Sequence, residues 1–273
     1  MMNSQINMKN LYEFHGQADN CTDKSFHENL KKNSKPASVK TSKIFIFCAK
    51  ICFKLSLIMI FMIIFNSLSN GTLIPFSVFT INSIIGFLCY SRYVIISNHR
   101  VQNFSKDLHV FIIFLVFSYI LSPVFKNLTE TVSTDTVYAL TTFMFVIHLL
   151  LNKYGLSDVS LTQSLSITSS LFGSIMLTSR LPSTLHAFCL LLTSVQSFVL
   201  LPKFLFKIAN PISLCLFTVS LTAFILYNTS YILLHIFLLI SLFMQLICPL
   251  FFVKWQVYKE NIYGPWDEAI IQF

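Results

Sequence analysis

The chain has 273 residues, of which 55% are hydrophobic and only 11% are charged, with a formal net charge of +8. An ordinary soluble domain carries about 25% charged residues, so this composition excludes that class and predicts an integral membrane protein. The length suits one helical bundle and leaves no room for a soluble catalytic domain.

The amino-terminal tail, residues 1–43, is polar and rich in Asn, Ser and Lys, and we expect it to be mostly disordered. It has no apolar core segment, so no cleavable signal peptide is expected. Lys43, Lys50 and Lys54 are spaced by seven and four residues, which puts them on one face of the first helix. They either snorkel to the headgroups as anchors of that helix or form a basic strip that gathers an anionic lipid.

Charge-free apolar runs predict a membrane domain over residues 44–253. A helix that crosses a bilayer needs about 20 apolar residues, so the long runs 55–91 and 208–253 each hold two helices. Polar turn residues around Asn70 and Asn228 divide these runs. The predicted fold class is all-α, a polytopic bundle of about eight transmembrane helices over residues 46–68, 73–96, 108–126, 136–153, 159–179, 183–202, 210–228 and 231–253. An open sheet is excluded in lipid, and no sustained alternation of period two favours a barrel.

The distribution of basic residues predicts the orientation of the bundle. With eight spans, both termini lie on one side, and the tails and loops of that side hold most of the lysines. The opposite side has only Lys126 and Arg180. This positive-inside bias predicts that both termini are cytosolic, and we expect the first span to target the chain to the endoplasmic reticulum membrane.

The segment between the third and fourth spans, which we call the hinge (residues 129–135), is dense in hydroxyls and carboxylates. Such groups beside membrane-length apolar runs are costly unless they are paired or used. The candidate site residues here, with a structural or a lipid-handling role, are Glu130, Ser133, Thr134 and Asp135.

Arg180 lies in the turn between the fifth and sixth spans, on the same side as the hinge. Its guanidinium is expected to pair with Glu130 or Asp135. An ion pair partly shielded by helix ends would fix the geometry of the bundle, so we favour a structural role for these three residues over catalysis.

The fifth span contains small hydroxyl residues at every fourth position beside Gly173, namely Ser166, Ser170, Ser174 and Thr178. Small residues at this spacing let another helix approach closely. We therefore expect this helix to face protein instead of lipid.

Histidines, cysteines and glycines form no pattern that predicts catalysis. His148 and His186 each stand without a partner at ligand spacing and are expected to be packed or at an interface. The seven cysteines include no CxxC pair, and the six glycines form no nucleotide-binding loop. We therefore assign no catalytic residue, no metal and no cofactor.

The carboxy-terminal tail, residues 254–273, contains both tryptophans of the chain. Trp255 and Tyr258 follow the last span and are typical of an interfacial aromatic belt. Trp266 stands beside two carboxylates, which would be repelled by anionic lipid, so we favour protein docking there. The predicted subunit-docking residues are Gly264, Pro265, Trp266, Asp267 and Glu268.

Three stretches together resemble the PIG-C family, in that family's order and spacing. They read SPVFKNLTETVSTDTVYAL at 122–140, SRLPSTLHAF at 179–188 and YKENIYGPWDEA at 258–269. Members of the family are multi-pass subunits of the complex that starts glycosylphosphatidylinositol (GPI) anchor synthesis. The resemblance implies a non-catalytic subunit in the transfer of N-acetylglucosamine from UDP-N-acetylglucosamine to phosphatidylinositol. Its implied partners are the other subunits, including a separate catalytic one, and phosphatidylinositol itself.

Two other classes of protein remain as alternatives. A multi-pass transporter would usually show internal repeats or broken helices with paired intramembrane charges, and the sequence has neither. A stand-alone lipid-modifying enzyme would need a cluster of His or carboxylate groups at a membrane face, where the hinge is the only candidate.

Overall fold

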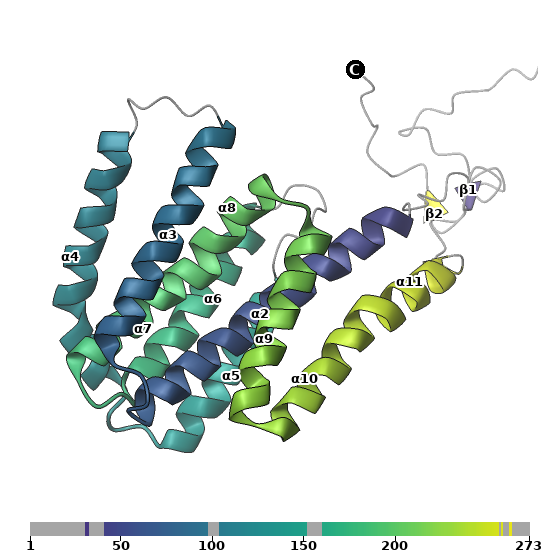
Figure 1. Ribbon diagram of the computed structural model, residues 1–273. Helices are drawn as coiled ribbons and strands as arrows, with labels where there is room; N and C mark the ends of the chain where they lie inside the picture. The colour runs from purple at the N-terminus through teal and green to yellow at the C-terminus, as the bar shows by residue number, and fades with distance from the viewer. Residues whose placement is uncertain are drawn as a thin grey trace, which may run out of the picture. The chain divides into compact units, whose positions relative to one another are not determined.

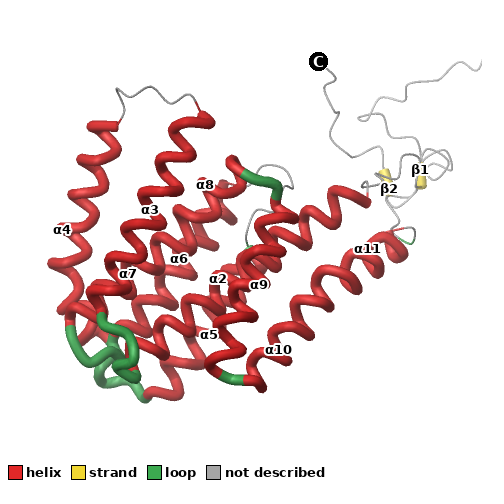
Figure 2. The backbone as a smooth tube through the Cα atoms, viewed as in Figure 1, coloured by secondary structure: helices red, strands yellow, loops and turns green. Residues whose placement is uncertain are grey.

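The structure is a computed structural model that describes residues 31–32, 41–97, 104–151, 160–256, 258 and 262–263. The chain divides into two compact units, Val39–Lys254 and the pair of tails, Met1–Ser38 with Trp255–Phe273. The larger unit is a bundle of helices lying side by side (Figure 1). Short loops join most neighbouring helices (Figure 2).

The described residues of the bundle form eight helical rods, one at each position predicted from the sequence. The helices are α2 (Thr41–Ser69), α3 (Pro75–Ser97), α4 (Phe104–Leu128), α5 (Thr134–Leu150), α6 (Ser160–Thr178), α7 (Thr184–Val195), α8 (Leu201–Ile208), α9 (Pro211–Thr229), α10 (Tyr231–Leu242) and α11 (Cys248–Gln256). One π-helical turn, η2 (Gln196–Leu200), joins α7 to α8, and another, η3 (Phe243–Ile247), joins α10 to α11. The all-α prediction is confirmed.

Within the described residues, six rods are long and apolar enough to cross a membrane. The other two are α5, which is apolar but has 17 residues, and α6, whose 19 residues include many hydroxyls. These two helices pack closely against each other. The hydroxyl-rich helix thus lies against protein, as its spacing of small residues predicted.

Both π-helical turns have the same local cause. Each is followed two residues later by a proline, Pro202 after η2 and Pro249 after η3. Proline has no N–H to donate to the carbonyl four residues earlier, and its ring crowds that carbonyl. Before these two prolines the helix widens by one residue, which accommodates the ring. The sixth rod therefore continues to Ile208, whereas the sequence predicted its end at Pro202.

The second rod begins after a tight turn at the polar break that the sequence predicted. α2 ends at Ser69, and Gly71 adopts a positive φ of 70°. Glycine adopts this left-handed conformation without the steric cost that a side chain adds.

α2 is the central helix of the bundle. In its most hydrophobic window 56% of the residues are buried, against 11% for α3 and for α4. Phe61, on α2, is fully buried, and its ring centroid lies 5.8 Å from that of Phe145 on α5 and 5.1 Å from that of Phe198 on η2. A second buried cluster joins α2 to α9 through Cys52, Phe53 and Cys215.

The unit formed by the tails contains a pair of two-residue strands that the sequence did not predict. β1 (Lys31–Lys32) pairs antiparallel with β2 (Ile262–Tyr263), with Lys31 opposite Tyr263. The two tails are therefore in contact with each other.

Candidate functional site

The hinge meets the turn between α6 and α7 at one end of the bundle. Nη2 of Arg180 donates hydrogen bonds to the carbonyl oxygen of Thr129, 3.0 Å away, and to that of Val132. The hydroxyl of Thr129 donates to the hydroxyl of Ser179. Nε of Arg180 is buried and has no hydrogen-bond partner among the described residues. The side chain of Arg180 thus holds the backbone of the hinge.

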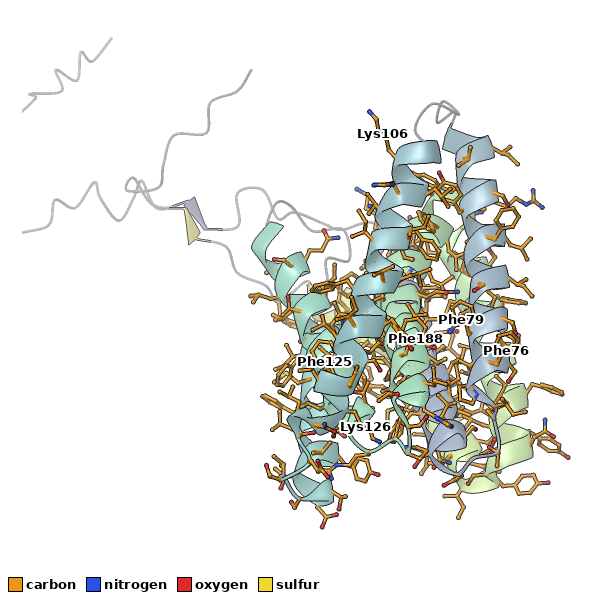
Figure 3. The ribbon with its side chains drawn as sticks, turned by 90° about the vertical axis from the view of Figure 1, so that its left-hand side faces the viewer. Phe76, Phe79, Lys106, Phe125, Lys126 and Phe188 are labelled. Atoms are coloured by element: carbon orange, nitrogen blue, oxygen red, sulfur yellow. The ribbon has the colours of Figure 1, made fainter. Side chains whose placement is uncertain are left out.

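The end of α4 is joined to the start of α7 at the same place. Nζ of Lys126 donates to the carbonyl oxygen of Pro182 at 2.9 Å. The hydroxyl of Ser122 donates to the carbonyl oxygen of Thr184 at 2.5 Å. Figure 3 shows Lys126 near this end of α4 and Lys106 near the other. Both basic residues predicted on this side, Lys126 and Arg180, therefore donate to loop carbonyls.

The predicted ion pair between Arg180 and a hinge carboxylate is not formed among the described residues. Glu130 and Asp135 are both exposed, and the turn of the hinge directs carbonyl oxygens at the guanidinium instead. Ser133 caps α5, its hydroxyl oxygen accepting from the amide of Thr136 at 3.3 Å. Asp135 lies in the first turn of α5, where the helix dipole favours a carboxylate.

Thr134, the remaining predicted hinge residue, is the exposed first residue of α5. The hinge residues therefore connect α4 to α5, and their carbonyl oxygens accept hydrogen bonds from Arg180.

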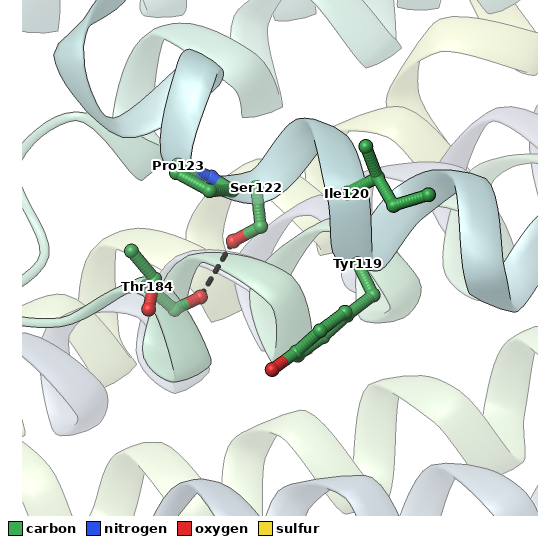
Figure 4. Close-up of a pocket in the computed structure, with 5 residues that line it drawn as sticks. All are labelled: Tyr119, Ile120, Ser122, Pro123 and Thr184. Atoms are coloured by element: carbon green, nitrogen blue, oxygen red, sulfur yellow. Dashed lines mark hydrogen bonds between the residues drawn. The ribbon is translucent and has the colours of Figure 1, made fainter.

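A pocket of about 170 Å³ lies between α4 and α7, close to the hinge (Figure 4). Its lining residues are Tyr119, Ile120, Ser122, Pro123 and Thr184. Pro123 lies inside α4 and cannot donate a hydrogen bond to the carbonyl of Tyr119. The pocket is smaller than the roughly 300–1,000 Å³ of typical small-molecule sites.

A second small pocket, of about 150 Å³, is lined in part by Gln245, a residue that was not predicted as a site residue. Nε2 of Gln245, on η3, donates to Sγ of Cys215 at 2.7 Å and to Sγ of Cys52 at 3.4 Å. The buried thiols of Cys52 and Cys215 therefore accept hydrogen bonds. The available signal was that Gln245 is the single amide of the predicted span 231–253.

The predicted basic face of α2 changes character with depth. Lys43 is exposed near the start of the helix, and Lys50 is half-buried with Nζ 5.8 Å from the ring centroid of Phe206. Lys54 is only 6% exposed. It lies eleven residues beyond Lys43, about 16 Å along the helix. This face packs against the bundle, so the three lysines do not form one exposed strip.

The bundle interior contains a polar group centred on His148, which is 1% exposed. Nδ1 of His148 lies 2.8 Å from the carbonyl oxygen of Ser166 and 3.0 Å from its hydroxyl. Lys54 is close enough to interact electrostatically with the imidazole. His148 is thus a packed histidine, as expected.

His186, the other histidine considered, lies 2.7 Å from the hydroxyl of Ser183 through Nδ1. In the described part of the chain, no three His, Cys, Asp or Glu residues are grouped so that they could hold a metal ion.

The small-residue face of α6 packs against α5 as predicted. Its four hydroxyl residues, Ser166, Ser170, Ser174 and Thr178, are all fully buried. A Cβ added to Gly173 would lie 3.3 Å from Cβ of Met144 on α5. Only small side chains therefore permit this helix spacing.

The predicted docking segment, residues 264–268, lies outside the described residues. Trp255 and Tyr258, expected in an interfacial belt, are 64% and 75% exposed.

Comparison with known proteins identifies the family. Residues 8–267 match the family model described as GPI2: Phosphatidylinositol N-acetylglucosaminyltransferase. The chain belongs to this family. The GPI2 family match takes in the hinge, the Arg180 turn and the predicted docking segment as far as Asp267.

Relatives with the same transferase in their names align with most of this chain. A human protein, named as a subunit of phosphatidylinositol N-acetylglucosaminyltransferase, is 32% identical over 97% of this chain and 92% of its own. A Dictyostelium discoideum protein, named as a putative subunit of the same transferase, is also 32% identical, over 96% and 79%. The Schizosaccharomyces pombe GPI2 subunit is 26% identical, over 96% and 86%. No solved structure matches the chain.

Proposed function

We propose that the chain is a non-catalytic membrane subunit of the complex that transfers N-acetylglucosamine from UDP-N-acetylglucosamine to phosphatidylinositol. This reaction is the first step of GPI-anchor biosynthesis. The observation that carries the proposal is the near full-length match to relatives named as a subunit of that transferase.

A scaffold role is supported by what the polar groups of the candidate site do. Arg180 and Lys126 donate to backbone carbonyls, and Ser133 caps a helix. These contacts hold helix ends together. The catalytic subunit would be a separate chain that docks at residues 264–268. The other subunits would complete the complex.

The proposed location is the endoplasmic reticulum membrane, with both tails, residues 1–43 and 254–273, in the cytosol. The charges at the two ends of the bundle support this orientation. Lys50, Lys203, Lys207 and Lys254 lie at the end away from the hinge, which would be cytosolic by the positive-inside rule. Sugar transfer from a nucleotide donor would then occur on the side that carries the tails.

The proposal is tested by sugar transfer in membranes from cells that lack this subunit. Radiolabelled UDP-N-acetylglucosamine is supplied, and labelled lipid is measured with and without the restored full-length chain. We expect transfer only when the chain and the catalytic subunit are both present, and a complex that co-purifies with the chain. Transfer by the purified chain alone would show that it is itself the catalyst.

A further inference from the structure

A basic patch that the sequence analysis did not predict lies at the end of the bundle away from the hinge. We define the α8 patch as Lys203 and Lys207 on α8 with Tyr93 on α3. The rod that begins at Thr184, beside the hinge, runs 25 residues to Ile208, which is about 37 Å at 1.5 Å per residue. The patch therefore lies where helix ends meet the lipid headgroups.

The cation of Lys207 is held in a defined position. Its Nζ donates to the hydroxyl oxygen of Tyr93 at 3.3 Å and lies 5.0 Å from the centroid of that ring. The ring centroid of Phe204 on α8 lies 5.0 Å from that of Tyr93 and 6.4 Å from that of Tyr90. A lysine that serves only as a membrane anchor extends toward water. Here aromatic packing between α3 and α8 fixes where the charge is.

The two lysines of the α8 patch leave a positive charge to be neutralised. They are four residues apart on one helix and both exposed, a spacing at which like charges destabilise the helix. α8 itself has no carboxylate. Among the described side chains, neither lysine forms an ion pair. A bound anion that contacts both ammonium groups would remove this repulsion.

The orientation of the α8 patch depends on the π-helical turn η2. The extra residue of a π turn rotates the helix that follows by about 100° relative to an uninterrupted α-helix. Phe204 consequently faces α3, while Phe206 packs on Phe53 of α2 with ring centroids 5.1 Å apart. Lys203 is left on the exposed side of α8. The π turn therefore sets the direction in which the patch faces.

We propose that the α8 patch binds the phosphodiester group of an anionic phospholipid, with Lys203 and Lys207 on its oxygens and Tyr93 positioning Lys207. A lipid source is favoured over a free nucleotide phosphate because α3 exposes apolar side chains beside the patch, including Ile95. The identity of that lipid as phosphatidylinositol rests on the proposed function. Lipid binding can be measured without sugar transfer. The lipid-binding proposal can therefore be refuted while the proposed function stands, and the reverse.

The test uses the full-length chain in a neutral detergent, titrated with fluorescent phosphatidylinositol, phosphatidylserine or phosphatidylcholine in mixed micelles. We expect binding of the two anionic lipids and much weaker binding of phosphatidylcholine. Each lysine near an anionic phosphate contributes about the equivalent of a fivefold change in affinity, so K203Q/K207Q should weaken anionic lipid binding about twenty-five-fold. K203R/K207R should retain binding, which separates lost charge from misfolding.

The matched control is K106Q/K254Q, which removes two exposed lysines from the same end of the bundle but outside the α8 patch. We expect little change in its lipid affinity. Equal losses in the two double variants would overturn the proposal, since the binding would then be general surface attraction. Binding of phosphatidylcholine as tight as that of the anionic lipids, or displacement of bound lipid by micromolar UDP-N-acetylglucosamine, would also overturn it.

Tyr93→Phe gives a second measurement on a side chain that keeps its ring. It removes the hydroxyl that accepts from Lys207, and we expect a loss of severalfold in affinity for anionic lipid. Unchanged affinity would remove Tyr93 from the patch. Intact sugar transfer in a complex whose α8 patch no longer binds lipid would leave the proposed function standing and remove the patch as its lipid site.

Discussion

Nη2 of Arg180 donates a hydrogen bond to the carbonyl oxygen of Thr129, 3.0 Å away, across a sequence separation of 51 residues. The same nitrogen donates to the carbonyl of Val132, so one side chain spans the turn of the hinge. A guanidinium presents several donors in a fixed plane, which suits it to hold two carbonyl groups at once. The junction between α4 and α5 is thereby tied to the junction between α6 and α7.

Arg180→Gln should destabilise the bundle. Hydrogen bonds from a charged donor contribute about 1.5–3 kcal/mol each, and this change also leaves the hinge carbonyls without the guanidinium. We expect a lower thermal unfolding midpoint in detergent and less assembled complex in the membrane. Arg180→Lys should recover only part of the loss, because an ammonium lacks the planar fork. A midpoint equal to that of the wild type would contradict the role assigned to Arg180.

Asp135→Asn should have a smaller effect than Arg180→Gln. Asp135 is exposed and interacts with the start of α5, an interaction of about 0.3–1 kcal/mol. We expect slightly less assembled complex and unchanged transferase activity per complex. Quantifying the complex by pull-down before the activity assay separates the two quantities. Normal assembly with lost turnover would instead indicate that the hinge handles lipid or takes part in chemistry.

Gly173→Leu should separate α5 from α6. A Cβ at this position already approaches Cβ of Met144 to 3.3 Å, and inserted methylene groups in a packed core cost about 1–3 kcal/mol. The unfolding midpoint should fall accordingly. Gly86 is a matched control on α3, since the nearest atom to an added Cβ there is 3.8 Å away. Gly86→Ala should be neutral or stabilising.

Trp266→Ala should weaken co-purification of the catalytic subunit while the chain remains stably inserted. Truncation of a buried interface tryptophan typically costs about 2 kcal/mol or more, which is roughly a thirtyfold loss in affinity. Trp255→Ala should do much less, because Trp255 is exposed at the end of the last rod, where we expect the membrane interface. The greater loss of transferase activity in Trp255→Ala would reverse this assignment.

The orientation is testable with glycosylation acceptors. An acceptor in a long linker inserted after Glu130 should be modified in the lumen, whereas one in the amino-terminal tail should remain unmodified. A shift in gel mobility that glycosidase reverses reports the modification. Glycosylation of the tail acceptor would place that terminus in the lumen and refute the proposed topology.

The arrangement of helices was predictable from the sequence because bilayer length and turn chemistry act locally. The polar break at Gly71 and the small residues around Gly173 each indicated the correct local geometry. The rod that continues past Pro202 was not predicted, since a proline usually ends a helix and the π turn that tolerates it leaves no separate sequence signal.

The sequence predicted where Arg180 lies, but not which groups accept its hydrogen bonds. Residue types placed Arg180 beside the hinge, but charge alone suggested carboxylate partners, whereas the path of the backbone supplied carbonyl oxygens. The pairing of Lys207 with Tyr93 joins residues 114 positions apart, so no local pattern indicates it. Lys54 shared a helical face with Lys43, yet burial depends on which face the rest of the bundle covers.

Apart from Ser166, whose hydroxyl contacts His148 on α5, the buried hydroxyls along α6 impose a limit on size and none on polarity. Ser170, Ser174 and Thr178 donate to carbonyl oxygens of Ile167, Leu171 and Ile175 in their own helix. Their contribution to the contact with neighbouring helices is therefore shape. Alanine at Ser170 or Ser174 would serve that contact equally well, and so would glycine apart from its lower helix propensity. Substitutions at these positions can therefore change the polarity of the side chain without loss of the helix contact, provided that its volume stays small.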